Sequence, residues 1–204
     1  MTKFNIVEIF ESLQGEGYNT GMPAIFIRFA GCNLNCQWCD TNFRQYTKMT
    51  LEMILEKIAL FESKNIIITG GEPTLQKYLP LLLSQLKKNG YFIAIESNGL
   101  GKIDPHFDYI ALSPKFCYWN RYQTIQQPQI DEIRIVVEEK SDFYDFCLFI
   151  EKHFHAKRYY LSPCELDGQF NILATIQILG RINQGRTDNK WLLSFQTHKF
   201  ANID

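Results

Sequence analysis

Short apolar runs rich in β-branched and aromatic residues alternate along the chain with segments of helical periodicity. This alternation is typical of βα units that surround a largely parallel sheet. With 204 residues the chain can bury one sizeable core, and no repeat or low-complexity linker divides it. We therefore expect one α/β domain over residues 1–204. After a first strand near the N-terminus, the expected strands cover residues 24–29, 66–69, 92–96, 109–112, 132–137, 159–161 and 191–195.

Three of the intervening segments have apolar residues at helical spacing. The expected helices cover residues 50–63, 75–90 and 141–154. Thr50 and Ser141 are expected to cap the first and third helices, and Gly90 to end the second, in which Pro80 is the one unfavourable residue. Residues 117–128 are aromatic and rich in glutamine without a clear period, so a loop is expected there.

The overall charge indicates no polyanionic partner. Lys and Arg number 21 against 22 Asp and Glu, for a formal net charge of −1. This balance gives no sign of nucleic-acid binding or of a polybasic membrane surface. The N-terminus lacks the pattern of a signal peptide, and no apolar run approaches the length of a membrane span. We therefore expect a soluble cytoplasmic protein with neither a nucleic acid nor a membrane as partner.

Three cysteines lie close together in the segment GCNLNCQWCDT. In a reducing cytoplasm such a tight group indicates metal binding or catalysis rather than disulfides. A zinc site would need a remote fourth ligand, because no histidine precedes His106 and no further cysteine precedes Cys117. An iron–sulfur cluster held by Cys32, Cys36 and Cys39 would leave one iron open to a substrate or cofactor. Buried structural thiols are the weaker alternative because the intervening residues are polar.

Polar side chains follow three neighbouring strands of the predicted sheet at the points where the strands end. The segments are TGGE at 69–72, ESN at 96–98 and SPK at 113–115. Each alone fits an ordinary turn, but the carboxyl ends of parallel strands meet at one edge, where barrel-type sheets carry their chemistry. Glycine there lets a ligand approach the backbone, and a carboxylate can bind an ammonium group. A binding site is therefore expected at this edge.

The CxxxCxxC spacing, with the aromatic Trp38 before the third cysteine, resembles that of the radical S-adenosylmethionine (SAM) superfamily. The resemblance implies a radical SAM core, which is a partial (incomplete) TIM-type β/α barrel with a largely parallel sheet. It also implies that Cys32, Cys36 and Cys39 are the catalytic ligands of a [4Fe-4S] cluster, with SAM chelating the fourth iron. The residues implied in cofactor binding are Trp38, Asp40, Gly71, Glu72, Ser97, Ser113, Lys115 and Ser162.

The combination of QGEG, CDT, TGGEP, ESNG, LSPK and QTHK resembles the 7-carboxy-7-deazaguanine synthase family over essentially the whole chain. This resemblance implies a carbon–nitrogen lyase of queuosine biosynthesis, and hence of tRNA modification. Its substrate would be 6-carboxy-5,6,7,8-tetrahydropterin, and a radical ring contraction would expel ammonia to give 7-carboxy-7-deazaguanine. The implied substrate-binding residues are Leu13, Gln14, Gly15, Glu16, Arg28, Thr69, His198 and Asp204. A Mg²⁺ ion on Thr41, a flavodoxin-type electron donor and a homodimer are implied as well.

Some residues and functions keep a second interpretation. Arg28 suits a substrate carboxylate but could form a surface ion pair, and Thr41 could be a turn residue. Ser162 stands where the family commonly has glutamine, and its shorter side chain reaches less far. A glycyl-radical activating enzyme would share the cysteine spacing but leave QGEG and QTHK without a role. A non-enzymatic iron–sulfur electron carrier or a zinc-binding module would bind no SAM.

Overall fold

Parallel pairing of neighbouring strands builds most of the main sheet. The computed structural model describes residues 2–39, 41–127, 129–166, 168–187, 191–201 and 203. Within these residues the main sheet has nine strands in the order β11-β8-β7-β6-β5-β4-β2-β1-β3. Neighbours from β11 to β2 pair in parallel, whereas β1 pairs with β2 and β3 in antiparallel fashion. The strands are β1 (Lys3–Leu13), β2 (Pro23–Phe29), β3 (Thr47–Thr50), β4 (Asn65–Gly70), β5 (Phe92–Ser97), β6 (Tyr109–Leu112), β7 (Ile130–Val136), β8 (Ala156–Ser162) and β11 (Trp191–Leu193).

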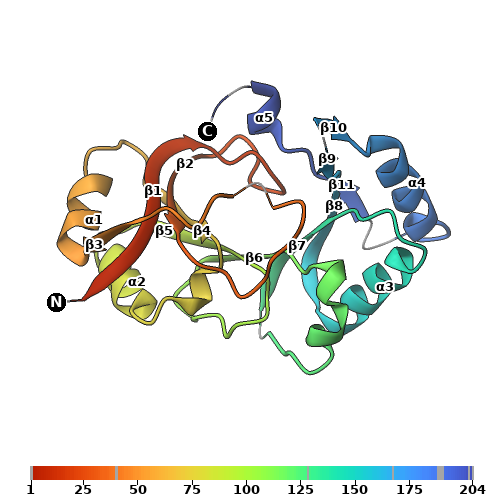
Figure 1. The fold of residues 1–204 in the computed structure, drawn as a ribbon, viewed down its shortest axis with the longest axis horizontal. Helices are drawn as coiled ribbons and strands as arrows, with labels where there is room; N and C mark the ends of the chain where they lie inside the picture. The colour runs from red at the N-terminus through yellow and green to blue at the C-terminus, as the bar shows by residue number, and fades with distance from the viewer. Residues whose placement is uncertain are drawn as a thin grey trace.

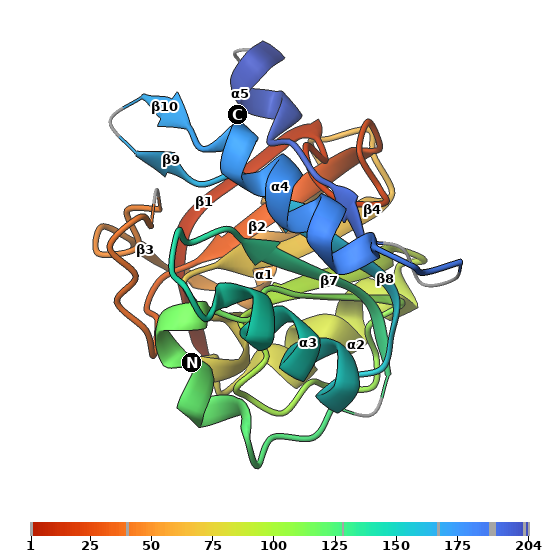
Figure 2. The same cartoon turned by 90° about the vertical axis from the view of Figure 1, so that its right-hand side faces the viewer.

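The sheet is curved, and the longer helices lie on its outer side (Figure 1). Figure 2 shows α3 and α4 lying across the half of the sheet that contains β7 and β8. The predicted α/β fold with a largely parallel sheet is confirmed, and the sheet runs from an edge at β11 to an edge at β3 in the described part of the chain. The helices are α1 (Leu51–Ile58), α2 (Leu79–Lys88), α3 (Phe143–His153), α4 (Ile172–Asn183) and α5 (Thr197–Ala201), with 3-10 helices η1 (Pro73–Leu75) and η2 (Phe116–Tyr122).

Alternation along the strands gives the sheet two chemically different faces. In β2 and β4, Ile25, Ile27 and Ile66 belong to the large core, which also contains the buried leucines of α2. The residues between them face the concave side, where Ala24 and Phe26 form a small apolar cluster with Ile67 and Ala94. Two positions beyond the last of these apolar residues, the next residue on the concave side of each strand is polar. The concave face is therefore apolar at one end of the strands and polar at the end where the site is expected.

Most predicted elements are present, with shifted boundaries. Thr50 caps α1 as predicted, because its hydroxyl accepts a hydrogen bond from the Met53 N–H at 3.3 Å. Pro80 lies in the first turn of α2, where no intrahelical N–H bond is lost, and this explains why α2 begins later than predicted. The Ser141 cap was wrong, because α3 begins after Asp142, and no side-chain hydrogen bond caps it.

Other elements lie in segments for which the sequence predicted no regular structure. They are β3, α4, α5, η1, η2 and a two-stranded ladder of β9 (Glu165–Leu166) with β10 (Gln169–Phe170). The expected loop at 117–128 overlaps η2, which begins one residue earlier and whose aromatic residues pack against α3; the ring centroids of Phe116 and Phe143 are 5.6 Å apart. The strand expected at 191–195 ends at Leu193. No helix within the described residues has the length and hydropathy needed to cross a bilayer.

Phe146 of α3 provides a test of this packing. It is fully buried and contacts four aromatic rings, those of Phe116, Trp119, Tyr122 and Phe143. Phe146→Ala is expected to lower the free energy of unfolding by about 3–5 kcal/mol in urea denaturation. Phe200→Ala is the matched control, since Phe200 is 62% exposed, and it should cost far less. Equal losses in the two variants would contradict the described core.

Candidate active site

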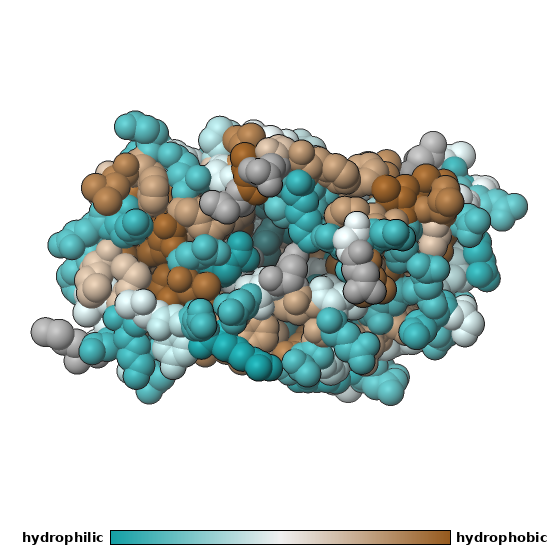
Figure 3. All heavy atoms as spheres, turned by 45° about the horizontal axis from the view of Figure 1, so that its top comes forward, coloured by the Kyte–Doolittle hydropathy of each residue, from teal (hydrophilic) through white to brown (hydrophobic). Residues whose placement is uncertain are grey.

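Two adjacent cavities lie on the concave side of the sheet. The first, here called the Arg28 cavity, has a volume of about 660 Å³, and Arg28, Phe10 and His198 are among its lining residues. The second, called the cysteine cavity, has a volume of about 550 Å³ and is lined by the three cysteines of the CxxxCxxC segment, among others. Figure 3 shows the molecule hollowed near the middle of one face. The residues that line both cavities are Glu16, Thr41, Thr69, Glu96, Gln196 and Lys199.

The three cysteines of the motif surround one side of the cysteine cavity as free thiols. Burial raises the pKa of the Cys32 thiol above its ordinary value and that of Cys36 to about 12. Both therefore stay protonated at neutral pH until a metal binds the thiolates and displaces the protons. No group of three His, Cys, Asp or Glu side chains within the described ranges converges on a single metal-ion site. An iron–sulfur cluster instead takes each thiolate on a different iron, so the thiolates surround it.

The 3-10 helix η2 holds the cysteine loop by hydrogen bonds. The Asn35 N–H donates to the Tyr118 hydroxyl at 2.9 Å, and the Arg121 guanidinium donates to the Asn33 carbonyl at 3.2 Å. Cys117, for which the sequence indicated no role, hydrogen-bonds with the Cys36 thiol. The segment expected to be a loop thus supports the metal-binding candidates.

Six of the residues predicted to bind the cofactor line the cysteine cavity. They are Trp38, Gly71, Ser97, Ser113, Lys115 and Ser162. The Lys115 ammonium donates to the Ser113 hydroxyl at 2.7 Å and lies 4.8 Å from the centre of the Trp38 ring. Burial lowers the pKa of this ammonium below its usual range. Asp40 lies outside the described residues.

The structure does not bring the Glu72 carboxylate into the cysteine cavity. Glu72 is fully buried and accepts hydrogen bonds from the Thr74 N–H at 3.1 Å, the Ser97 hydroxyl at 2.8 Å and the Asn98 N–H at 2.8 Å. It therefore ties the end of β4 to the end of β5. A ligand in the cavity would meet the glycine before it, Gly71, rather than this carboxylate.

Gly71 stands where two backbones touch. A Cβ on Gly71 would lie 2.0 Å from the Gly31 carbonyl oxygen, immediately before the cysteine loop. The same carbonyl accepts the Glu72 N–H at 2.8 Å, and the Gly71 N–H donates to the Phe29 carbonyl at 2.9 Å. This close approach therefore requires glycine at position 71, and it joins the start of the cysteine loop to the end of β4.

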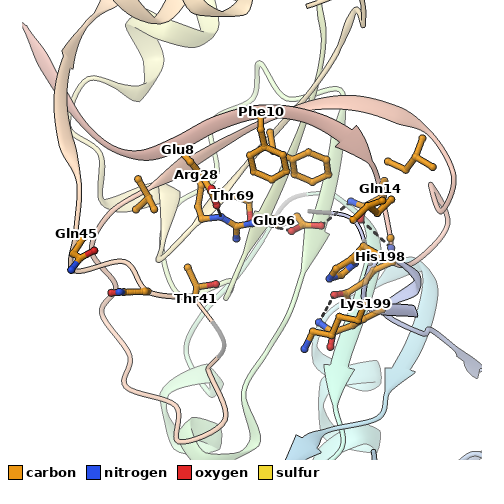
Figure 4. Close-up of a pocket in the computed structure, with 18 residues that line it drawn as sticks. Glu8, Phe10, Gln14, Arg28, Thr41, Gln45, Thr69, Glu96, His198 and Lys199 are labelled. Atoms are coloured by element: carbon orange, nitrogen blue, oxygen red, sulfur yellow. Dashed lines mark hydrogen bonds and ion pairs between the residues drawn. The ribbon is translucent and has the colours of Figure 1, made fainter. Parts of the chain in front are cut away.

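The predicted substrate-binding residues gather around the Arg28 cavity (Figure 4). Those that line it are Leu13, Gln14, Gly15, Glu16, Arg28, Thr69 and His198, whereas Asp204 lies outside the described residues. Gly15 has no room for a side chain, because a Cβ there would lie 2.1 Å from Nδ1 of His198. The Thr197 N–H also donates to the Gly15 carbonyl at 2.9 Å. The QGEG and QTHK segments are therefore in direct contact.

Arg28 is consistent with both interpretations of its role. Its Nε donates to a Glu8 carboxylate oxygen at 2.6 Å, which is the predicted ion pair. Its guanidinium carbon lies 5.7 Å from the centre of the Phe10 ring, and the side chain still lines the cavity. Because Glu8 engages only Nε in this pair, the fork can present other donors to a carboxylate in the cavity.

The sequence assigned no role to Arg134 or to Glu132, whereas it did single out Glu16 and Glu96, the other two carboxylates that contact Arg134. The Arg134 side chain is 7% exposed, and its nitrogens contact carboxylate oxygens of Glu132 at 2.9 Å, Glu16 at 3.2 Å and Glu96 at 2.5 Å. Burial opposes the ionisation of Glu96, but Arg134, with hydrogen bonds from Gln14 and Thr69, outweighs it and lowers the pKa of Glu96 to about 2. The available signal was three charged residues in the otherwise apolar strand "IDEIRIV", of which Glu132 and Arg134 stand at alternate positions and so share one face of the sheet.

Comparison with known proteins supplies the family. The chain is 54% identical to the 7-carboxy-7-deazaguanine synthase of Haemophilus influenzae, with 98% of this chain and 94% of the relative covered. It is 50% identical to the protein of the same name from Neisseria meningitidis, with 99% and 95% covered. The chain belongs to the 7-carboxy-7-deazaguanine synthase family. Within it, residues 26–111 match the Radical SAM superfamily.

Solved structures agree with this membership of the 7-carboxy-7-deazaguanine synthase family. The crystal structure of QueE from Escherichia coli matches with a TM-score of 0.74 and 27% identity, covering 95% of this chain and 93% of that chain. Streptococcus suis SuiB bound to its precursor peptide SuiA matches with a TM-score of 0.50 and 14% identity, which shows a shared fold only. The radical SAM family implies a [4Fe-4S] cluster and SAM.

The described residues of this 7-carboxy-7-deazaguanine synthase family member suit those two groups. Three free thiols face a cavity large enough for a small-molecule ligand. Two side-chain atoms near them, Nε1 of Trp38 and the Ser162 hydroxyl oxygen, are buried without a hydrogen-bond partner among the described residues. Buried polar atoms are normally paired, so these two are candidates to contact a bound group.

Gly71→Ala tests the contact between the TGGE segment and the cysteine loop. The added methyl group would overlap the Gly31 carbonyl, so we expect a loss of about 1–3 kcal/mol of stability and less iron bound after anaerobic reconstitution. Iron and sulfide analysis with urea denaturation measures both. Gly180→Ala is the control, because no atom lies within 4 Å of a Cβ there. Normal iron content in Gly71→Ala would refute the described contact.

The pKa of Glu96 predicts how stability depends on pH. Because its folded pKa is lowered to about 2 from the ordinary value of 4.5, the ionised group stabilises the fold above pH 4.5. This contribution is lost as the pH falls. Between pH 7 and pH 3, the free energy of unfolding of the wild type should therefore fall by about 2 kcal/mol more than that of Glu96→Gln. Urea denaturation at both pH values measures the difference. Parallel pH profiles would contradict the described ionisation.

Proposed function

We propose that this protein converts 6-carboxy-5,6,7,8-tetrahydropterin to 7-carboxy-7-deazaguanine with loss of ammonia, a step of queuosine biosynthesis that leads to tRNA modification. The observation that carries the proposal is the pair of adjacent cavities, one lined by three thiols and the other by polar groups that suit a pterin. The names of the relatives that are 54% and 50% identical support the same activity.

The cysteine cavity would hold the cofactors. Cys32, Cys36 and Cys39 would bind the [4Fe-4S] cluster. With one electron from an external donor, the cluster and SAM would supply radical chemistry able to remove a hydrogen atom from the pterin carbon that bears the carboxylate. The residues that would contact SAM are Trp38, Gly71, Ser97, Ser113, Lys115 and Ser162, with Asp40 at the cluster and Glu72 as a support behind Gly71.

The Arg28 cavity would hold the pterin. Its ring edge presents amide and amine groups, which Gln14, Glu16 and the backbone of the neighbouring residues can bind by hydrogen bonds. The Arg28 fork would bind the carboxylate. Glu96 is ionised at neutral pH and can only accept hydrogen bonds, so it orients N–H groups rather than donating a proton. The remaining residues that would bind the pterin are Leu13, Gly15, Thr69, His198 and Asp204.

A Mg²⁺ ion, a second subunit and an electron donor would complete the enzyme. Thr41 lines both cavities, so a Mg²⁺ ion held by its oxygen would lie between the cofactors and the substrate. The working enzyme would be a cytoplasmic homodimer that receives electrons from a flavodoxin-type donor. A glycyl-radical activating enzyme is not favoured, because QGEG and QTHK together form a wall of the Arg28 cavity.

The direct test is product formation. The protein with its cluster reconstituted without oxygen is given SAM, Mg²⁺, a reductant and 6-carboxy-5,6,7,8-tetrahydropterin. Mass spectrometry should detect 7-carboxy-7-deazaguanine. Formation of 5′-deoxyadenosine alone would leave the radical SAM chemistry standing and refute the substrate.

Arg28→Ala tests the assignment of the substrate carboxylate. Loss of a charge-assisted hydrogen bond is expected to lower kcat/KM for the pterin by about 10- to 100-fold. Cluster assembly and SAM cleavage without the pterin should be unchanged, because Arg28 does not line the cysteine cavity. Arg181→Ala, on the exposed side of α4, is the control for loss of one arginine. Unchanged turnover in Arg28→Ala would remove Arg28 from the substrate site.

A further inference from the structure

Arg134 is held rigidly from behind by a carboxylate that faces neither cavity. Glu132 is 2% exposed and accepts hydrogen bonds from the Tyr18 N–H at 2.9 Å and the Tyr109 hydroxyl at 2.7 Å. Its other oxygen contacts Nε of Arg134 at 2.9 Å. A Cβ on Gly17 would lie 2.2 Å from the same carboxylate, so the loop after β1 closes over it. The guanidinium therefore has one fixed orientation.

On its other side Arg134 contacts two carboxylates that face both cavities. One terminal nitrogen contacts Glu96 at 2.5 Å and the other contacts Glu16 at 3.2 Å. Each carboxylate has further donors: Gln14 at 2.9 Å and Thr69 at 3.1 Å bind Glu96, and Gln196 at 2.9 Å binds Glu16. Glu16 and Glu96 come from segments that are distant in sequence, and Arg134 bridges their two carboxylates. Gln14 also links these residues, because its side chain donates to Glu96 and accepts the Glu16 N–H at 3.0 Å.

We infer that Arg134 is a positioning residue that fixes Glu96 and Glu16 on the wall shared by the two cavities. These carboxylates would then align a substrate in the Arg28 cavity with the cofactors in the cysteine cavity. Arg134 would act through these carboxylates rather than by touching the reacting atoms. The identity of the ligand rests on the proposed function, whereas the bridge itself rests on the contacts above.

The inference depends on the shape of the side chain as well as its charge. Three nitrogens of one planar guanidinium contact three separate carboxylates. A lysine would keep the positive charge but offers a single nitrogen, which cannot reach three carboxylates that surround a fork. Arg134→Lys therefore separates the loss of geometry from the loss of charge.

The experiment measures ligand binding apart from turnover. Reconstituted Arg134→Lys, with SAM but no reductant, is titrated with 6-carboxypterin, a stable fluorescent relative of the proposed substrate. The titration is done at saturating SAM, because Arg134 itself lines the cysteine cavity. The Kd for 6-carboxypterin is expected to rise at least about tenfold, while the iron content stays at the wild-type value. With reductant, more 5′-deoxyadenosine should form per product molecule than in the wild type, because the substrate is no longer aligned.

Arg158→Lys is the matched control, because Arg158 lies 3.5 Å from the Tyr18 ring centre and lines neither cavity. Wild-type binding and coupling in Arg134→Lys would overturn the inference. If Arg134→Lys does not fold, Glu132→Gln is measured instead, because this substitution weakens the contact that holds Arg134 without changing a residue that lines either cavity. Unchanged pterin binding in Glu132→Gln would also overturn the inference. A wild type that neither binds nor converts the pterin would refute the proposed function and, with it, the role of Arg134.

Discussion

One buried guanidinium joins three carboxylates on the concave face on which the site is built. Arg134 contacts Glu132, Glu16 and Glu96, and its charge is a main cause of the lowered pKa of Glu96. Leaving such a carboxylate unpaired typically costs about 3–5 kcal/mol. The arrangement also joins β7, β5 and the loop after β1. The placement of polar groups at the cavities is therefore inseparable from the pairing of these charges.

Segments near the two ends of the chain complete the site because glycine lets their backbones meet. Gly15 lies against His198 of α5, and the Thr197 N–H donates to the Gly15 carbonyl. The Gly17 N–H donates to the Ser194 hydroxyl at 2.9 Å, just after β11. In the motif QGEG, the functional candidates Gln14 and Glu16 thus alternate with two glycines that permit close packing.

The sequence predicted the parallel strands and the residues at their carboxyl ends well, because alternation and strand-end polar groups are local patterns. It did not predict α4, in which Leu173 and Ile176 are exposed while Thr175 is fully buried, so that hydrophobicity does not mark the side that packs against the protein. It also placed Glu72 among the cofactor-binding residues without indicating that its carboxylate is buried against Ser97 and Asn98.

The Arg134 bridge could not be predicted for a different reason. The two partners that it bridges, Glu96 and Glu16, lie 38 and 118 residues away, and their approach depends on which strands become neighbours and on the register between them. Residue types alone indicate that charges exist, whereas only the fold indicates which charges meet. The contacts between Gly71 and Gly31 and between Gly15 and His198 have the same origin.

The proposed reaction requires that the two adjacent cavities bring a pterin and SAM into reacting contact. The most direct measurement uses substrate labelled with deuterium on the carbon that bears the carboxylate, followed by mass spectrometry of the nucleoside products. The account predicts deuterium in 5′-deoxyadenosine or in recovered SAM, together with 7-carboxy-7-deazaguanine. Cleavage of SAM in the presence of the pterin without any transfer of deuterium would contradict it.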